Sequence, residues 1–340
     1  MIEAESGGKG TRATSPVLGK GRDPYSAFRR QLLPPERVRE LSVLTPSRVV
    51  IDTATCWLTI VACWAAAATW TEWWVIALVI PIIGARFYAL FIIGHDGMHR
   101  RLFPNRRVND WWTDLFCLGP IGAITHLNNR NHLRHHQYLA TENDPDRHKH
   151  ACFNKADPAE FVGFLSGLSG LGRSVVNVFS PNRTPTRPAD EETGGGYTAR
   201  DLLLLVVLQA GLATGLTLAV GWWAYPVLWV VPVYCFMYLG DNCRSFAEHS
   251  HPESDRLADD HRLITYRSNR VERFFVAPMN MNFHAVHHLW PSIPYYRLPE
   301  ADRLIERLPA AAGMEWRGTY AAYLVRYWLA LPLEECRPGE

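Results

Sequence analysis

The chain has 340 residues, of which 48% are hydrophobic and 20% charged, and its Lys and Arg residues barely outnumber its Asp and Glu residues, 35 against 33. This near balance excludes the strongly basic class of nucleic-acid-binding proteins, so we expect no nucleic-acid partner. The seven cysteines are odd in number and scattered, which argues against a disulfide framework and favours a reducing compartment for the polar segments.

The apolar residues are gathered in four long runs, arranged as two closely spaced pairs. Each run has about 18–22 residues, enough for a helix of about 27–33 Å that crosses a bilayer. Helices buried in a soluble core are the alternative, but the tight pairing favours membrane hairpins. We therefore predict an all-α integral membrane protein with four transmembrane helices, over residues 49–70, 73–93, 202–220 and 222–239.

The charges around these runs predict their orientation. The turns inside the two hairpins carry no Lys or Arg, whereas the segments before, between and after the hairpins carry most of them. By the positive-inside rule both termini and the middle segment are cytoplasmic. We expect a multi-pass protein, of the inner or plasma membrane if it is bacterial, with a flexible arm and pre-membrane segment (1–46), a membrane domain (47–308) and a C-terminal interfacial helix and tail (309–340).

Three clusters of histidines follow the cytoplasmic ends of the predicted helices. They are His95 and His99, then His132, His135 and His136, then His284, His287 and His288. Residues at i, i+3 and i+4 of a helix share a face, so each cluster directs its rings into one small volume. A lone histidine is usually a surface or core residue, but eight clustered rings indicate a site for iron, copper, zinc or nickel. They exceed the needs of one tetrahedral zinc ion, so we predict two metal ions in a cytoplasmic helical cap.

Other polar residues have less specific signals. Five histidines lack the cluster spacing, and we expect them at the surface: His126, His148, His150, His251 and His261. A metal-bound imidazole usually donates the N–H of its other ring nitrogen to a hydrogen-bond acceptor. The predicted acceptors are Asp96, Asp241, Glu248 and Asn282. The alternative is that these four residues cap helices or face solvent. The composition of residues 141–146 predicts a turn, and residues 300–308 and 316–331 are expected to form amphipathic surface helices.

The clusters and their contexts resemble those of the membrane fatty-acid desaturase superfamily, of the acyl-lipid and bacterial type. The matching contexts are HLRHHQYLATENDPD, starting at His132, and NFHAVHHLWPSIPYY, starting at Asn282, and the resemblance covers residues 47–308. It implies a non-haem di-iron centre (Fe2+) that uses O2 to remove hydrogens from a methylene of a fatty acyl chain. It also implies that the eight clustered histidines are catalytic iron ligands and that His249 is a ninth ligand. Related acyl-thioester enzymes have an asparagine one turn before that ligand, which holds a water on iron, and here Ser245 takes its place.

Other functions fit the same residues to different degrees. A hydroxylase or ketolase of a lipid, carotenoid or other hydrophobic substrate would use the same di-iron site and stays the alternative. A metal transporter would place its ligands near the membrane midplane. A membrane zinc hydrolase, with Glu248 as general base, would need only three ligands.

The electrons for an oxygen-dependent reaction must come from another protein. The chain has no iron–sulfur, flavin or nicotinamide motif, so we expect a small ferredoxin- or cytochrome-type donor. A basic segment after the first histidine cluster would receive an acidic carrier or anchor the chain at the lipid surface; it contains Arg100, Arg101, Arg106 and Arg107.

Overall fold

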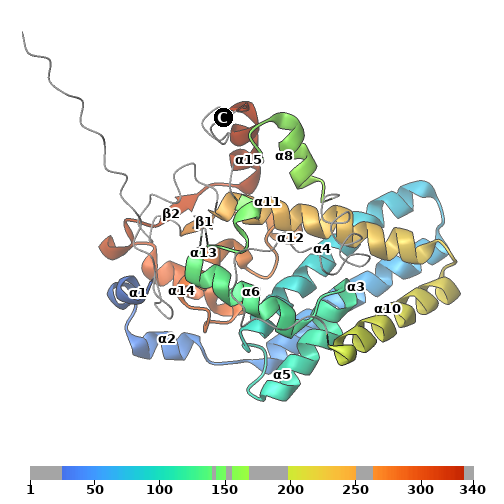
Figure 1. Cartoon of the computed structure of the whole chain (residues 1–340), viewed down its shortest axis with the longest axis horizontal. Helices are drawn as coiled ribbons and strands as arrows, with labels where there is room; N and C mark the ends of the chain where they lie inside the picture. The colour runs from blue at the N-terminus through green and yellow to red at the C-terminus, as the bar shows by residue number, and fades with distance from the viewer. Residues whose placement is uncertain (1–24, 140–142, 151–154, 168–197, 250–262, 333–340) are drawn as a thin grey trace, which may run out of the picture.

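The computed structural model describes residues 25–139, 143–150, 155–167, 198–249 and 263–332, and the expected flexible arm up to residue 24 lies outside them. Helices dominate the described residues (Figure 1). The α-helices are α1 (Ser26–Leu32), α2 (Pro35–Leu41), α3 (Pro46–Thr69), α4 (Trp73–Met98), α5 (Arg106–Trp112), α6 (Thr125–Tyr138), α7 (Arg147–His150), α8 (Pro158–Leu165), α10 (Ala199–Ala219), α11 (Tyr238–His249), α12 (Arg270–Phe275), α13 (His284–Leu289), α14 (Leu298–Ile305) and α15 (Tyr320–Leu329). Shorter segments of 3-10 or π type are η1 (Thr113–Leu118), η2 (Gly119–Ile121), η3 (Pro226–Val230), η4 (Pro232–Met237), η7 (Met281–Phe283), η8 (Tyr295–Arg297) and η9 (Pro309–Ala311).

Among the described residues, three helices are long and apolar enough to cross a membrane: α3, α4 and α10, with 24, 26 and 21 residues. They coincide with three of the four predicted transmembrane runs. Figure 1 shows them extending together toward one end of the molecule. Along α10 the apolar side chains face outward, with Leu203, Val206 and Leu218 64%, 63% and 83% exposed. Such a continuous apolar surface is typical of a protein that associates with a membrane.

The fourth predicted run, residues 222–239, is helical without being a regular α-helix. The helical path is continuous from residue 224 to residue 249, and it contains the π-helical segments η3 and η4, which begin at Pro226 and Pro232. Proline lacks the N–H of the regular i to i−4 bond, and a π turn accommodates that loss. The path continues directly into α11. Its crossing of a membrane stays a prediction, as do the two hairpins and the cytoplasmic cap.

Close packing on α4 positions the chain between the first two histidine clusters. A Cβ atom at Gly94 would overlap the side chain of Leu118, and a Cβ atom at Gly97 would overlap that of Thr113. Glycine at both positions therefore lets η1 lie directly on the last turns of α4. From there the chain leads through η2 into α6.

A small parallel sheet accompanies the helices, so the all-α expectation is incomplete. Strand β1 (Ile264–Tyr266) pairs along its whole length with strand β2 (Glu315–Arg317). The helix predicted to begin at residue 316 therefore begins later, at Tyr320, where the Thr319 side chain caps it by accepting a hydrogen bond from a backbone N–H.

The terminal segments pack onto the element that carries the third histidine cluster. Val286 and Leu289 of α13 and Leu298 and Ile305 of α14 are fully buried in one core. Arg29 of α1 donates a hydrogen bond to the carbonyl oxygen of Leu289 (2.8 Å). These contacts hold α13 in place over the ends of the long helices. The predicted division into segments 1–46, 47–308 and 309–340 stays a prediction.

Candidate metal centre

The end of α4 carries the first two predicted ligands. His95 lies in the last turn of the helix and His99 directly follows it, so the two rings project from one face, one turn apart. The Asn109 side chain donates to the carbonyl oxygen of Gly97 (2.8 Å) and accepts from the backbone N–H of Leu102 (3.1 Å). Because Asn109 is fully buried, these two bonds fix the chain where it leaves α4.

Two further helices each carry three histidines at positions i, i+3 and i+4, and a fourth helix carries one histidine. They are His132, His135 and His136 of α6, His284, His287 and His288 of α13, and His249 at the end of α11. Helical residues four apart point in nearly the same direction, whereas the residue at i+3 is rotated by about 60° from residue i. Each three-histidine helix is therefore able to direct a pair of rings to one side and a single ring to another.

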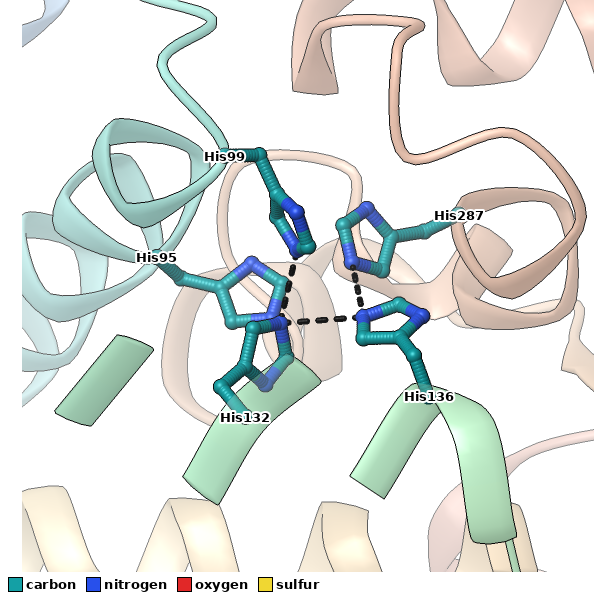
Figure 2. A group of neighbouring side chains, drawn as sticks. All are labelled: His95, His99, His132, His136 and His287. Carbon is teal, nitrogen blue, oxygen red and sulfur yellow. Dashed lines mark hydrogen bonds between the residues drawn. The ribbon is translucent and has the colours of Figure 1, made fainter. Parts of the chain in front are cut away.

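Five of the rings point toward one another, as Figure 2 shows. We call them the five-histidine group: His95, His99, His132, His136 and His287. One nitrogen from each ring lies within 4.8 Å of all the others. The Nε2 atom of His132 is 2.7 Å from that of His99 and 3.0 Å from that of His136. The Nε2 atoms of His136 and His287 are 3.2 Å apart.

The remaining four rings form a second group beside the first. We call it the four-histidine group: His135, His249, His284 and His288. The Nε2 atom of His284 is 3.1 Å from that of His249 and 2.9 Å from that of His288. The ring centroids of His136 and His288 are 4.3 Å apart, so the two groups are neighbours. The structure thus brings together all nine histidines predicted as ligands.

The geometry of the two groups fits metal ions better than hydrogen bonding among the rings. A neutral imidazole has one N–H and one lone pair, yet within the described residues five Nδ1 atoms have no hydrogen-bond partner, those of His95, His136, His249, His287 and His288. Metal ions bound between the rings would use the lone pairs of the Nε2 atoms, and each Nδ1 atom would then carry the N–H. With bonds of about 2.1 Å, two nitrogens at right angles on one ion lie about 3.0 Å apart. The Nε2 separations of 2.7–3.2 Å match this value.

Burial also holds the rings in the form that binds metals. Loss of solvent, followed by the neighbouring histidines, lowers the pKa of His132, His136 and His287 well below its ordinary value. A neutral ring keeps the lone pair that a metal ion needs.

The comparisons with known proteins agree on one family. A model of the fatty acid desaturase family matches residues 71–320, which include both histidine groups. The chain belongs to the fatty acid desaturase family.

Three relatives illustrate this family. Dihydrorhizobitoxine desaturase of Bradyrhizobium elkanii is 25% identical over 299 residues, 83% of each chain. A beta-carotene ketolase of a Paracoccus strain is 26% identical over 254 residues, 71% of this chain and 88% of the relative. A chloroplastic omega-3 fatty acid desaturase of Glycine max is 24% identical over 270 residues, 70% of this chain and 55% of the relative. The protein is an oxidoreductase of the fatty acid desaturase type.

One histidine outside the clusters lies beside the four-histidine group. The expectation that His150 lies at the surface is wrong, because His150 is only 3% exposed. Its Nε2 donates to a carboxylate oxygen of Asp144 (3.0 Å), and the same carboxylate accepts from Nδ1 of His135 (2.9 Å). Burial would raise the pKa of Asp144, but these two imidazoles outweigh it and lower the pKa below its ordinary value. His148 is exposed, as predicted.

Sequence reasoning missed Asp144, and its signal was weak. The residue lies in the predicted turn nine positions after His135, and an acidic residue shortly after a histidine cluster is the only hint of its role. His251 and His261 lie outside the described residues, as does the side chain of His126.

The four predicted acceptors make no hydrogen bond to a ring nitrogen in the described part of the chain: Asp96, Asp241, Glu248 and Asn282. Asp96 and Glu248 come near, each with an oxygen 3.8 Å from a ring nitrogen, of His95 and His284 respectively, which exceeds a hydrogen-bond distance. Glu248 instead accepts a hydrogen bond from Arg244 (2.5 Å). These side chains hold the helices that carry the rings rather than the rings themselves.

A cavity of about 160 Å³ borders both histidine groups. Its lining includes His95, His132, His135, His249 and His284. The rest of the lining includes the charged side chains of Asp146, Lys149, Asp241 and Arg244, together with the apolar side chains of Phe91 and Met98. Ser245, one turn before His249, also lines this cavity. Burial would raise the pKa of Asp241, but the Lys149 and Arg244 cations outweigh it and lower the pKa.

Replacement of His287 by alanine tests the five-histidine group. We expect the variant to bind the metal of this group at least about tenfold more weakly, because one converging nitrogen is lost. The measurement is the metal content of the detergent-purified protein. His148→Ala, at an exposed histidine of α7, is the matched control and should keep its metal. A wild-type metal content in His287→Ala would contradict the ligand assignment.

Replacement of Asp144 by asparagine tests the contact that orients His135. An amide is a weaker acceptor for the His135 ring than a carboxylate, so we expect metal in the four-histidine group to be bound about 10–100-fold more weakly. Retention of metal during titration with a chelator measures the effect. Asp110→Asn, at a partly exposed carboxylate that pairs with Arg100, is the control. Equal retention in the Asp144→Asn protein and the wild type would show that Asp144 does not support the site.

Proposed function

We propose that this protein is an oxygen-dependent, non-haem di-iron desaturase that introduces a double bond into a fatty acyl chain. The observation that carries the proposal is the pair of adjacent groups of five and four histidines, the second fully buried and the first partly so. Nitrogen ligands without thiolates suit iron among the transition metals, and two neighbouring groups suit two ions. The ligands are then His95, His99, His132, His136 and His287 for one ion and His135, His249, His284 and His288 for the other.

Two bound irons would supply the oxidation of an unactivated C–H bond with O2. The protein's own residues provide the setting for this chemistry. Four helices hold the rings, and Asp144 orients His135. Glu248 is held by Arg244 and by the hydroxyl of Tyr320 (2.6 Å), which links α11 to α15. These contacts keep the site rigid and limit the entry of water.

A hydroxylase or ketolase is the second function that the comparisons favour. The relatives include a beta-carotene ketolase as well as desaturases, at similar identity. A ketolase of a lipid or a carotenoid would use the same histidines. The product, and not the ligand set, separates the two functions.

Two other functions fit the structure less well. A transporter would place its ligands along the middle of the membrane helices, whereas the histidines lie at helix ends. In a zinc hydrolase Glu248 would act as the general base, but its carboxylate is fully buried and already accepts hydrogen bonds from Arg244 and Tyr320.

The membrane orientation and the electron donor are part of the same proposal. The chain would cross the bilayer four times, with both termini and the metal site on the cytoplasmic side, as the distribution of Lys and Arg predicts. A small acidic ferredoxin- or cytochrome-type protein would dock where Arg100, Arg106 and Arg107 are exposed. These residues lie at and just after the end of α4, close in sequence to His99.

Metal analysis combined with product analysis tests the reaction. We expect about two irons per chain, as two histidine-rich sites require, and new double bonds in the acyl lipids of cells that express the protein. The iron of the five-histidine group and the new double bonds should be lost in cells that express His287→Ala. Oxygenated products would instead establish the hydroxylase or ketolase, and zinc without any change in lipids would contradict the oxidoreductase proposal.

Charge reversal tests the docking of the electron donor. In Arg106→Glu/Arg107→Glu, turnover with an acidic donor should fall about tenfold at low salt, because the attraction that speeds encounter is removed. The iron content should stay unchanged. Arg303→Glu/Arg326→Glu, at two exposed arginines of α14 and α15, is the matched control. Equal rates in the two double variants would contradict this docking site.

A further inference from the structure

The cavity beside the metal groups is too small for a long hydrocarbon chain, and charged side chains form part of its lining. Its volume is about 160 Å³, and a protein cavity of about 150 Å³ holds a molecule the size of benzene, with about six non-hydrogen atoms. Histidines of both groups line it. Any group bound in this cavity therefore lies beside the metal sites.

Lys149 and Asp241 line this cavity, and within the described residues their charged atoms have only long contacts. The Lys149 Nζ atom is 3.4 Å from Asp241 and 3.8 Å from Asp146. Asp241 lies 3.4 Å from the hydroxyl of Tyr88 and 3.5 Å from Arg244. Hydrogen bonds between ionised groups are usually about 2.7–2.9 Å long. Both side chains thus have capacity to bind a charged ligand more closely than they bind each other.

Arg244 differs from this pair because its contacts are short. Its guanidinium is 2.5 Å from Glu248 and 2.5 Å from the hydroxyl of Tyr88. These contacts engage it within the protein. The ammonium of Lys149 and the carboxylate of Asp241 are therefore the complementary pair that faces a ligand.

A hydrocarbon chain pressed against this pair would be unfavourable. It would remove water from an ammonium and a carboxylate and give neither a partner, and burial of poorly paired charges is costly. An apolar space exists elsewhere, in a groove of about 430 Å³ lined by side chains of α3, η1 and α10, among them Trp57, Leu115 and Leu212. No histidine of the two groups lines that groove.

We propose that the cavity binds a zwitterionic group of the substrate, with an ammonium against Asp241 and a carboxylate against Lys149. The proposal rests on the di-iron oxidation of the proposed function and concerns its substrate, and a free amino acid-like substrate would take the place of the fatty acyl chain. Because the cavity is so small, the oxidised carbon lies within a few bonds of the charged group. A free amino acid-like molecule and a lipid with such a head group present the same chemistry, and the test separates them.

The test measures binding without turnover, in the full-length, iron-loaded protein under anaerobic conditions. The readout is the unfolding temperature, because a ligand that binds the folded state raises it. The probes are 2-aminobutyrate, which is the charged group alone, and 2-aminohexadecanoate, which carries it on a long chain. Hexadecanoate, butyrate, hexadecylamine and butylamine are the matched ligands that lack one charge.

We expect the amino acids to raise the unfolding temperature more than the matched acids and amines do. Lys149→Met and Asp241→Asn should each weaken amino acid binding at least about tenfold, because each removes one charged partner. A shift with 2-aminobutyrate supports a small free substrate, and a shift with 2-aminohexadecanoate alone supports a lipid head group.

Equal shifts with the single-charge ligands, or no shift with either amino acid, would overturn the zwitterion assignment. This comparison within the wild type does not depend on whether the two variants fold. The iron content of the same preparation reports on the proposed function separately. Two irons per chain without a preference for the zwitterion would reject the substrate class and leave the di-iron proposal standing.

Discussion

The convergence of nine imidazoles in one largely buried volume is the constraint on which the rest of the structure depends. Their Nε2 atoms lie about as far apart as ligands on one ion do, and many of their Nδ1 atoms have no partner within the described residues. The rings do not stabilise this arrangement by themselves, so other contacts must hold the helices that carry them. Asn109 does so at the end of α4, and the Arg244–Glu248–Tyr320 chain of contacts does so on α11.

The sequence was sufficient to predict that the histidines converge, but not how they divide. On α6 the i and i+4 residues, His132 and His136, join the five-histidine group, and His135 joins the other. On α13 the roles are exchanged, so that the i+3 residue, His287, is the one in the five-histidine group. Spacing fixes the angle between rings on one helix. The rotation of one helix relative to another depends on packing between distant segments, which a single sequence does not reveal.

The features that prediction missed come from long-range contacts of this kind. His150 has no helical spacing to a cluster, and it is buried because Asp144 joins it to His135. The β1–β2 pair joins segments that are about fifty residues apart, with strands too short for a clear alternation of apolar residues. The three long apolar helices, by contrast, coincide with their predicted runs, because length and hydropathy are local properties. The prolines of the fourth run replaced regular α-helix with π turns.

The position of the substrate, rather than the ligand set, must decide what this site produces. Desaturases and a ketolase are all similar to this chain, so the shared histidines do not separate their reactions. Asp241, Ser245 and His249 recur every four residues along α11 and therefore lie along one face. Asp241 and Ser245 line the cavity beside His249, a predicted metal ligand. Because one rigid helix face carries all three side chains, a small rotation of α11 would move the substrate contact and the metal group together. Under the proposed zwitterion assignment, this face would couple the choice of substrate to the position of the oxidised carbon.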